Sequence, residues 1–240
     1  MDKQAASRIM ATTGWLSRQP EAFRTELLKR SFYRHHHAGK VLYDIGDPPS
    51  GVFGLVEGTL DVRLPNGHIG TVASPGFWIG EGAAFDRTPR RVALVARSPV
   101  RVFYLPLHEF DAMIGNSEYC RSFAILTIEH FEDALRVVAS LLPSDVTARV
   151  GARLLSLSHA GTGDGQVLSV TQSDLASMCG LTRQSVNRAI RRLVAECAIS
   201  SRYGKVTVID AGKLRQVAAD GGDGVLPRFP ETAGARSPEP

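Results

Sequence analysis

Apolar and polar positions alternate over much of residues 38–105, as they do in half-buried β-strands. Leu60 and Val62, for example, flank a polar residue, so both side chains should point to one face of a sheet. The Asn66-Gly67 pair is a strong hairpin signal, because both residue types tolerate a positive φ. Short strands separated by such turns predict a β-roll, sandwich or barrel.

Helical spacing replaces this alternation on both sides of the strands. Residues 14–30 are predicted to form a short amphipathic helix, and residues 117–142, which contain no glycine or proline, a long one. The long segment has an apolar stripe with alternating gaps of four and three residues: Cys120, Ala124, Thr127, Phe131, Ala134, Val138 and Leu141. We expect it to be a dimerisation helix, with burial inside a monomer as the alternative.

Residues 171–193 have the pattern of a helix, a tight turn and a second helix. Thr171 and Thr182 are expected to cap the two helices, and Gly180 suits the left-handed residue that ends the first. Two short strands around residues 203–205 predict a wing. The segment therefore has the pattern of a winged helix-turn-helix.

The second helix of this pair should expose a polar face made of Arg183, Gln184, Asn187 and Arg188. Arginine can donate two hydrogen bonds to guanine, and glutamine or asparagine can pair with adenine in the same way. Nearby hydroxyl groups are placed for phosphate contacts: Ser173, Thr182 and Ser185. The face predicts binding to double-stranded DNA, with a plain solvated surface as the alternative.

Charge supports a division into domains. Residues 145–218 hold ten Lys/Arg against five Asp/Glu, whereas the rest of the chain is close to neutral. The predicted organisation is a helix and β-roll sensor domain, a dimerisation helix, a winged helix-turn-helix domain and a disordered tail: residues 1–116, 117–142, 143–218 and 219–240. No apolar run is long enough for a membrane span and no secretory signal is recognisable, so we expect a cytoplasmic protein.

Other chemistry finds little support in the sequence. The three cysteines are scattered, which argues against a disulfide framework or a metal site. The run at residues 35–37 contains three histidines, but neighbours in a strand point to opposite faces, so we interpret it as solvated. No catalytic constellation is present, and we expect no enzyme activity.

The chain resembles the Crp/Fnr family of bacterial regulators over about residues 15–212. Residues 180–188 resemble the family pattern G-[CL]-[ST]-R-E-x-V-x-R. The resemblance implies that Arg183, Gln184 and Arg188 read bases. Gln184 replaces the usual glutamate, so the operator should differ at the base that this residue reads.

Residues 42–62 and 75–95 resemble the cyclic-nucleotide-binding roll of that family, a double-stranded β-helix. The resemblance implies an effector site at Gly80, Glu81 and Arg91, where the glutamate accepts from a ribose hydroxyl and the arginine pairs with phosphate. Val92 and Leu135, with Ala134, stand where hydroxyl residues are expected. A cyclic nucleotide or another small effector is therefore implied, and a relic structural pair is the alternative.

Together these features predict an α+β protein with an N-terminal β-roll, a long dimerisation helix and a C-terminal winged helix-turn-helix. The predicted function is that of a homodimeric transcription regulator on a pseudo-palindromic operator, with RNA polymerase as a further partner. Two alternatives stay open. One is a signalling module whose C-terminal domain binds protein, and the other is a ligand-independent DNA binder with an empty roll.

Overall fold

A computed structural model of the chain describes residues 1–158, 164–202 and 204–220. The chain divides into two compact units, Met1–Glu132 and Asp133–Pro240. Among the described residues, no helix combines the length and apolar character that a membrane span needs. Most of the predicted disordered tail, residues 221–240, lies outside the described residues, and its first two residues end a helix instead.

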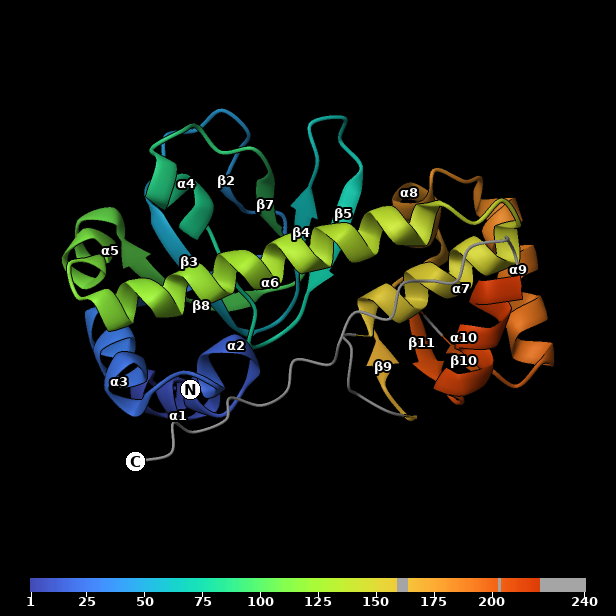
Figure 1. The fold of residues 1–240 in the computed structure, drawn as a ribbon, viewed down its shortest axis with the longest axis horizontal. Helices are drawn as coiled ribbons and strands as arrows, with labels where there is room; N and C mark the ends of the chain where they lie inside the picture. The colour runs from blue at the N-terminus through green and yellow to red at the C-terminus, as the bar shows by residue number, and fades with distance from the viewer. Residues whose placement is uncertain (159–163, 203, 221–240) are drawn as a thin grey trace. The chain divides into compact units, whose positions relative to one another are not determined.

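The first unit contains the predicted β-roll. Its strands are β1 Phe32–His36, β2 Val41–Tyr43, β3 Gly51–Glu57, β4 Leu60–Arg63, β5 Ile69–Ala73, β6 Trp78–Ile79, β7 Ala93–Ala96 and β8 Val100–Pro106. They pair antiparallel in two four-stranded sheets, ordered β1-β8-β3-β6 and β2-β7-β4-β5 (Figure 1). A short helix, α4 (Glu81–Asp86), separates β6 from β7 in the chain. The predicted order of roll, long helix and helix-turn-helix is confirmed.

An apolar interior lies between the two sheets. Its buried members come from six strands, β2, β3, β4, β5, β7 and β8: Tyr43, Phe53, Leu55, Leu60, Val62, Ala73, Leu94, Ala96, Val100 and Val102. Leu60 and Val62, which flank a polar residue in the sequence, both lie in this interior. Alternation along the strand is thus explained by one face turned to the core.

Helices cover the outer face of the sheet that contains β3 and β8. They are α1 Lys3–Ala11, α2 Gly14–Ser17, α3 Glu21–Arg30, α5 Leu107–Ile114 and the first part of α6 Ser117–Leu141. The prediction of one helix over residues 14–30 was wrong, because the chain breaks at Pro20, which precedes the first turn of α3. Proline lacks the N–H that a continuous helix would require there.

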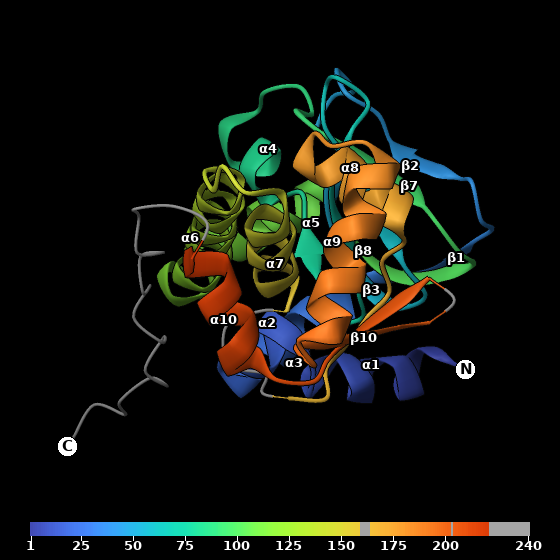
Figure 2. The same ribbon diagram turned by 90° about the vertical axis from the view of Figure 1, so that its right-hand side faces the viewer.

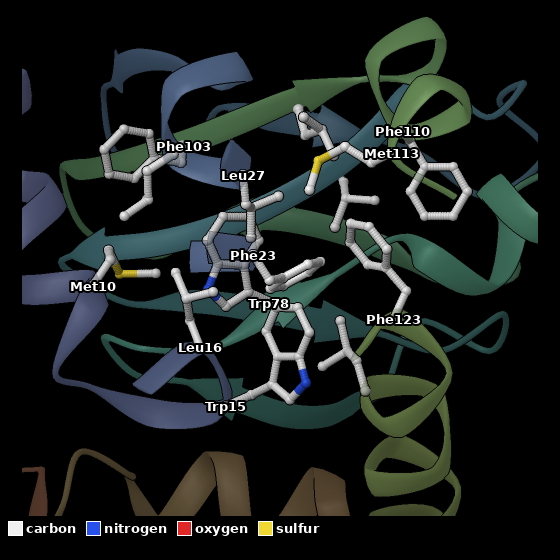
Figure 3. Packing of buried hydrophobic residues seen from close by; sticks show 14 of the residues in the cluster. Met10, Trp15, Leu16, Phe23, Leu27, Trp78, Phe103, Phe110, Met113 and Phe123 are labelled. Carbon is white, nitrogen blue, oxygen red and sulfur yellow. The ribbon is translucent and has the colours of Figure 1, made fainter. Parts of the chain in front are cut away.

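A second apolar core joins these helices to the roll, and several aromatic rings pack together in it (Figure 3). Trp15 lies edge-on to Trp78 at a centroid distance of 6.0 Å, and to Phe23 at 5.6 Å. Phe123 of α6 packs against Phe23 at 5.1 Å and against Phe110 at 4.8 Å. These contacts fix the beginning of α6 on the roll.

The rest of α6 keeps much of its apolar surface exposed. The side chains with the largest exposed fractions are Ile128 at 56 %, Phe131 at 63 % and Val138 at 58 %, and Leu142 just beyond the helix is 77 % exposed. With Leu135 these residues form a series whose gaps are three, four, three and four residues, which is coiled-coil spacing: Ile128, Phe131, Leu135, Val138 and Leu142. This apolar seam has no partner within the chain as described.

The second unit contains the winged helix-turn-helix. Its elements after α6 are α7 Val146–Leu157, β9 Val167–Leu168, α8 Gln172–Cys179, α9 Arg183–Ala195, β10 Ile199–Arg202, β11 Lys205–Val208 and α10 Ala211–Asp220. The strands form one sheet in the order β10-β11-β9. Figure 2 shows α9 in orange, running down from α8 with α7 beside it. The arrangement leaves one long side of α9 uncovered.

Candidate functional site

The position of α8 is fixed at its first turn by a capping box. The Thr171 hydroxyl accepts a hydrogen bond from the Asp174 N–H at 3.1 Å, and the Asp174 carboxylate accepts one from the Thr171 N–H at 2.7 Å. Each side chain thereby satisfies a backbone donor that the helix itself leaves without a partner. The sequence pattern had placed both residues at this turn.

The turn between α8 and α9 depends on one glycine. Gly180 has φ 63°, the left-handed conformation that ends α8 without steric cost only for glycine. The Leu181 N–H then donates to the Ala176 carbonyl at 2.9 Å, and Thr182 caps α9 by accepting from the Ser185 N–H at 3.1 Å. The two helices are therefore joined by three residues that are held by hydrogen bonds to the end of α8 and the start of α9.

One face of α9 is buried and the other is polar. The buried side chains are Val186, Ala189, Ile190 and Leu193. On the opposite face Arg183, Gln184 and Arg188 are exposed, and Asn187 is half-buried. Within the described part of the chain, neither Arg183 nor Arg188 takes part in an ion pair. Their guanidinium groups can therefore donate to a partner outside the protein.

The predicted phosphate contacts lie around the start of this face. Thr182 and Ser173 are exposed, whereas Ser185 is half-buried and accepts from the Thr182 hydroxyl at 3.0 Å. The wing follows as the β10–β11 hairpin, in which Arg202 pairs with Lys205 across the turn. Residue 203, part of the predicted turn, lies outside the described residues. Hydroxyl groups and cations thus border the polar face of α9.

One contact here was not predicted. The Asn187 side-chain amide donates to the Gln172 side-chain oxygen at 3.0 Å, which links α9 to the first residue of α8. Asn187 was expected only on the exposed face. No local pattern could have identified Gln172, because the contact depends on the angle at which the two helices cross.

The candidate effector site in the first unit is built around Glu81. Gly80 precedes α4 with φ 114°, and the Glu81 side chain that follows is only 5 % exposed. Glu81 Oε1 lies 2.7 Å from His130 Nδ1 on α6, and the Phe77 ring packs on the imidazole at a centroid distance of 5.4 Å. A buried carboxylate needs such a partner, since burying it alone would be costly.

A buried arginine lies beside this pair. Arg90 is 3 % exposed and donates to the carbonyls of Gly51 at 2.7 Å and Gly80 at 3.1 Å. Its guanidinium lies 4.2 Å from the centroid of the Tyr43 ring, a cation–π contact. Burial lowers the pKa of Arg90 and raises the pKa of Tyr43 above its usual range. The site thus contains a cation held by neutral protein groups.

The other predicted effector residues lie elsewhere. Arg91 points outward, with 63 % of its side chain exposed, and forms an ion pair with Asp86 at 2.6 Å. Val92 is half-buried against the interior of the roll, and Leu135 is an exposed residue of α6 within the second unit. The structure therefore brings Gly80 and Glu81 together with Arg90, not with Arg91.

Neither Arg90 nor His130 was singled out from the sequence. Counting ten residues from Glu81 selects Arg91, and the adjacent Arg90 was the only clue to a second choice. Which arginine turns inward depends on the loop after α4, where Arg87 adopts a left-handed conformation with φ 59°. No sequence pattern singles out His130, because its partner Glu81 lies 49 positions away in the chain.

The fit of a cyclic nucleotide to these residues is incomplete. Glu81 Oε2 and Arg90 Nε are buried without a hydrogen-bond partner, so an acceptor and a donor remain at the site. However, Glu81 Oε1 and the terminal nitrogens of Arg90 already bond to protein groups, and the exposed Arg91 is paired with Asp86. A ligand that needs more than Glu81 Oε2 and Arg90 Nε would have to replace these existing contacts.

Metal chemistry finds no support in the described part of the chain, where no group of three or more His, Cys, Asp or Glu side chains could hold an ion. His35 and His37 do pack together, with ring centroids 5.2 Å apart. The free cysteines differ in environment, and burial raises the pKa of Cys179 to about 11. The Cys179 thiol therefore stays protonated at neutral pH, whereas metal binding needs a thiolate.

Comparison with known proteins agrees with both parts of the fold. Residues 33–117 match the model of the cyclic nucleotide-binding domain, and residues 148–217 match that of the Crp-like helix-turn-helix domain. The transcriptional regulator SdrP of Thermus thermophilus is 30 % identical over 154 residues, which cover 62 % of this chain and 73 % of SdrP.

Two further proteins extend the comparison. The cAMP-activated global transcriptional regulator CRP of Pasteurella multocida is 25 % identical over 193 residues, 74 % of this chain and 92 % of that protein. The solved structure of FixK2 from Bradyrhizobium japonicum superposes with a TM-score of 0.68 at 19 % identity, covering 79 % of this chain and 98 % of FixK2. The likeness to FixK2 shows that the fold is shared.

Proposed function

The chain belongs to the Crp/Fnr family of transcription regulators, and we propose that it recognises its operator through the exposed face of α9. The observation that carries this proposal is the pair of arginines, Arg183 and Arg188. Both are exposed on a helix fixed by its cap, and neither has a counter-charge among the described residues. Guanidinium groups of this kind match guanine edges in the major groove.

The neighbouring side chains have complementary roles in this proposal. Gln184 reads a base beside the two arginines, and Asn187 contributes a base contact with the part of its amide that Gln172 leaves free. The hydroxyls of Ser173, Thr182 and Ser185 contact phosphates and so set the register of the helix on the duplex.

Dimerisation follows from the apolar seam of α6. A second copy of the chain would cover Ile128, Phe131, Leu135, Val138 and Leu142 and remove their apolar surface from water. Two α9 helices related by a twofold axis require a pseudo-palindromic operator, with half-sites about 34–36 Å apart. The regulator is therefore a homodimer in this proposal.

The roll is the regulatory part. A cyclic nucleotide or another small effector is the class of ligand that the cyclic nucleotide-binding domain suggests, and RNA polymerase is the partner through which a bound regulator would alter transcription. This role needs no catalytic group, and it implies a cytoplasmic location, where bacterial DNA lies.

Selection from random duplexes with the full chain, with and without cyclic nucleotide, tests the proposal. We expect enrichment of a pseudo-palindrome. Arg183→Ala should weaken binding to the selected duplex by about 1–3 kcal/mol and relax one base position. Arg215→Ala, an exposed arginine of α10, is the matched control and should change neither. Equal losses on selected and random DNA would contradict base reading by Arg183.

A further inference from the structure

His130 makes a contact between two elements that a regulator must couple. Its Nδ1 lies 2.7 Å from Glu81 Oε1, so a side chain of α6 is bonded to the first residue of α4 in the roll. The two side chains are 25 % and 5 % exposed. The nearby Arg18–Glu129 pair, also at 2.7 Å, is 58 % and 28 % exposed and therefore weaker.

Loss of the imidazole would be costly at this position. Glu81 Oε2 is buried without a partner, so Oε1 carries the hydrogen bond to His130 that compensates the burial of the carboxylate. Phe77 holds the imidazole from one side. The contact between His130 and Glu81 should therefore be present in the ligand-free protein and should not require a ligand to form.

Arg90, the second charged side chain of the same site, also has its partners within the protein. Its two carbonyl acceptors, Gly51 and Gly80, belong to β3 and to the residue before α4, and its guanidinium rests on Tyr43. A methyl group on Gly80 would lie 2.7 Å from Arg90 Nη1, so the glycine leaves room for this arginine. Both charged side chains of the site thus have protein partners already.

We propose that His130 takes the place of a bound effector, so that α6 is tied to the roll in the ligand-free chain and the operator is bound without added nucleotide. This inference rests on the DNA-binding function proposed above. His130 is then a positioning residue for DNA recognition. A ligand that competes for Glu81 Oε1 must displace the imidazole, so it would weaken operator binding rather than strengthen it.

The test compares three variants of the full chain on the selected duplex by fluorescence anisotropy without nucleotide. His130→Ala should lower operator affinity about tenfold, because it removes the partner of a buried carboxylate. His130→Asn should retain affinity within about threefold, since its amide can donate to Glu81. His108→Ala removes an imidazole that is 77 % exposed and should have no effect.

A second measurement needs no variant. Millimolar cyclic AMP or cyclic GMP should leave the operator affinity of the unmodified chain unchanged or lower it. A tenfold increase would overturn the inference, as would equal affinities for His130→Ala and the unmodified chain. This nucleotide titration tests the role proposed for His130 even if His130→Ala does not fold.

The two proposals fail in different ways. If no duplex is enriched under any condition, the proposed DNA-binding function fails. If a palindrome is enriched only in the presence of nucleotide, that function stands and the role assigned to His130 is overturned.

Discussion

Asn187 and Gln172 are joined by a hydrogen bond of 3.0 Å, from the asparagine amide on α9 to the glutamine oxygen on α8. The bond fixes one edge of the polar face of α9 to the preceding helix. It also occupies part of an amide that could otherwise pair fully with adenine. Asn187 therefore has a hydrogen-bond partner within the protein as well as a place at the edge of the polar face of α9.

A double-mutant cycle should reveal this coupling. Asn187→Ala and Gln172→Ala should each lower operator affinity by about 1 kcal/mol, and the double variant should lose less than the sum, because both changes remove the same bond. Anisotropy on the selected duplex gives the four affinities. Strict additivity would show that the bond does not contribute to DNA recognition.

Gly80 should be essential to the roll for a steric reason. Gly80→Ala would place Cβ 2.7 Å from both Arg90 Nη1 and the Gly51 carbonyl oxygen. The backbone φ of 114° is also one that residues other than glycine rarely adopt. We expect the free energy of unfolding of the first unit to fall by about 2 kcal/mol or more.

Gly82→Ala is the matched control, two residues along in α4. A Cβ there meets nothing within 4 Å, so chemical denaturation should show no loss of stability and a gain of up to about 1 kcal/mol. Equal destabilisation by the two substitutions would refute the steric argument.

Dimerisation through the apolar seam of α6, as proposed above, should be sensitive to charge. Val138→Glu places a carboxylate in an interface that would otherwise exclude water, so dimer affinity should fall about a hundredfold or more. Sedimentation velocity checks the oligomeric state. Val41→Glu, at a valine of β2 that is 41 % exposed, should leave it unaltered. A Val138→Glu protein that remains dimeric would place the interface elsewhere.

Arg91 should act on Asp86 rather than on a ligand. The hydrogen bond from Arg91, with those from Thr88, lowers the pKa of Asp86 from 3.8 to about 2. Because the folded-state pKa is depressed, any stabilisation is present above pH 3.8 and is lost as the pH falls through about 2. The pair is exposed, so its contribution to stability should be small.

In Arg91→Ala the pKa of Asp86 should rise part of the way toward 3.8, since Thr88 still donates. Carboxyl chemical shifts in an NMR titration measure it directly. An Asp86 pKa that stays near 2 would mean that Arg91 has another partner in solution.

The helix-turn-helix could be predicted closely because its signals are local. Caps at Thr171 and Thr182, the left-handed Gly180 and the spacing of Val186 and Ile190 all act within a few residues. Each of these features follows from backbone geometry that the neighbouring sequence determines. The alternation along the strands predicted a β-roll, sandwich or barrel for the same reason, and the family resemblance selected the roll.

The effector site was harder to predict because its contacts are not local. The inward turn of Arg90 depends on carbonyls of Gly51 and Gly80, which the fold brings to it from 39 and 10 positions away. His130 reaches Glu81 across 49 positions. Counting along a motif cannot distinguish Arg90 from Arg91 when the acceptors lie on other elements.

The aromatic core of the first unit has a practical consequence for measuring stability. Both tryptophans of the chain, Trp15 and Trp78, lie in that core, at 4 % and 1 % exposure, and residues 133–240 contain none. Intrinsic tryptophan emission therefore reports on the roll and its helices alone, while circular dichroism detects both units. Comparing the two signals during denaturation would separate the unfolding of the first unit from the unfolding of the second.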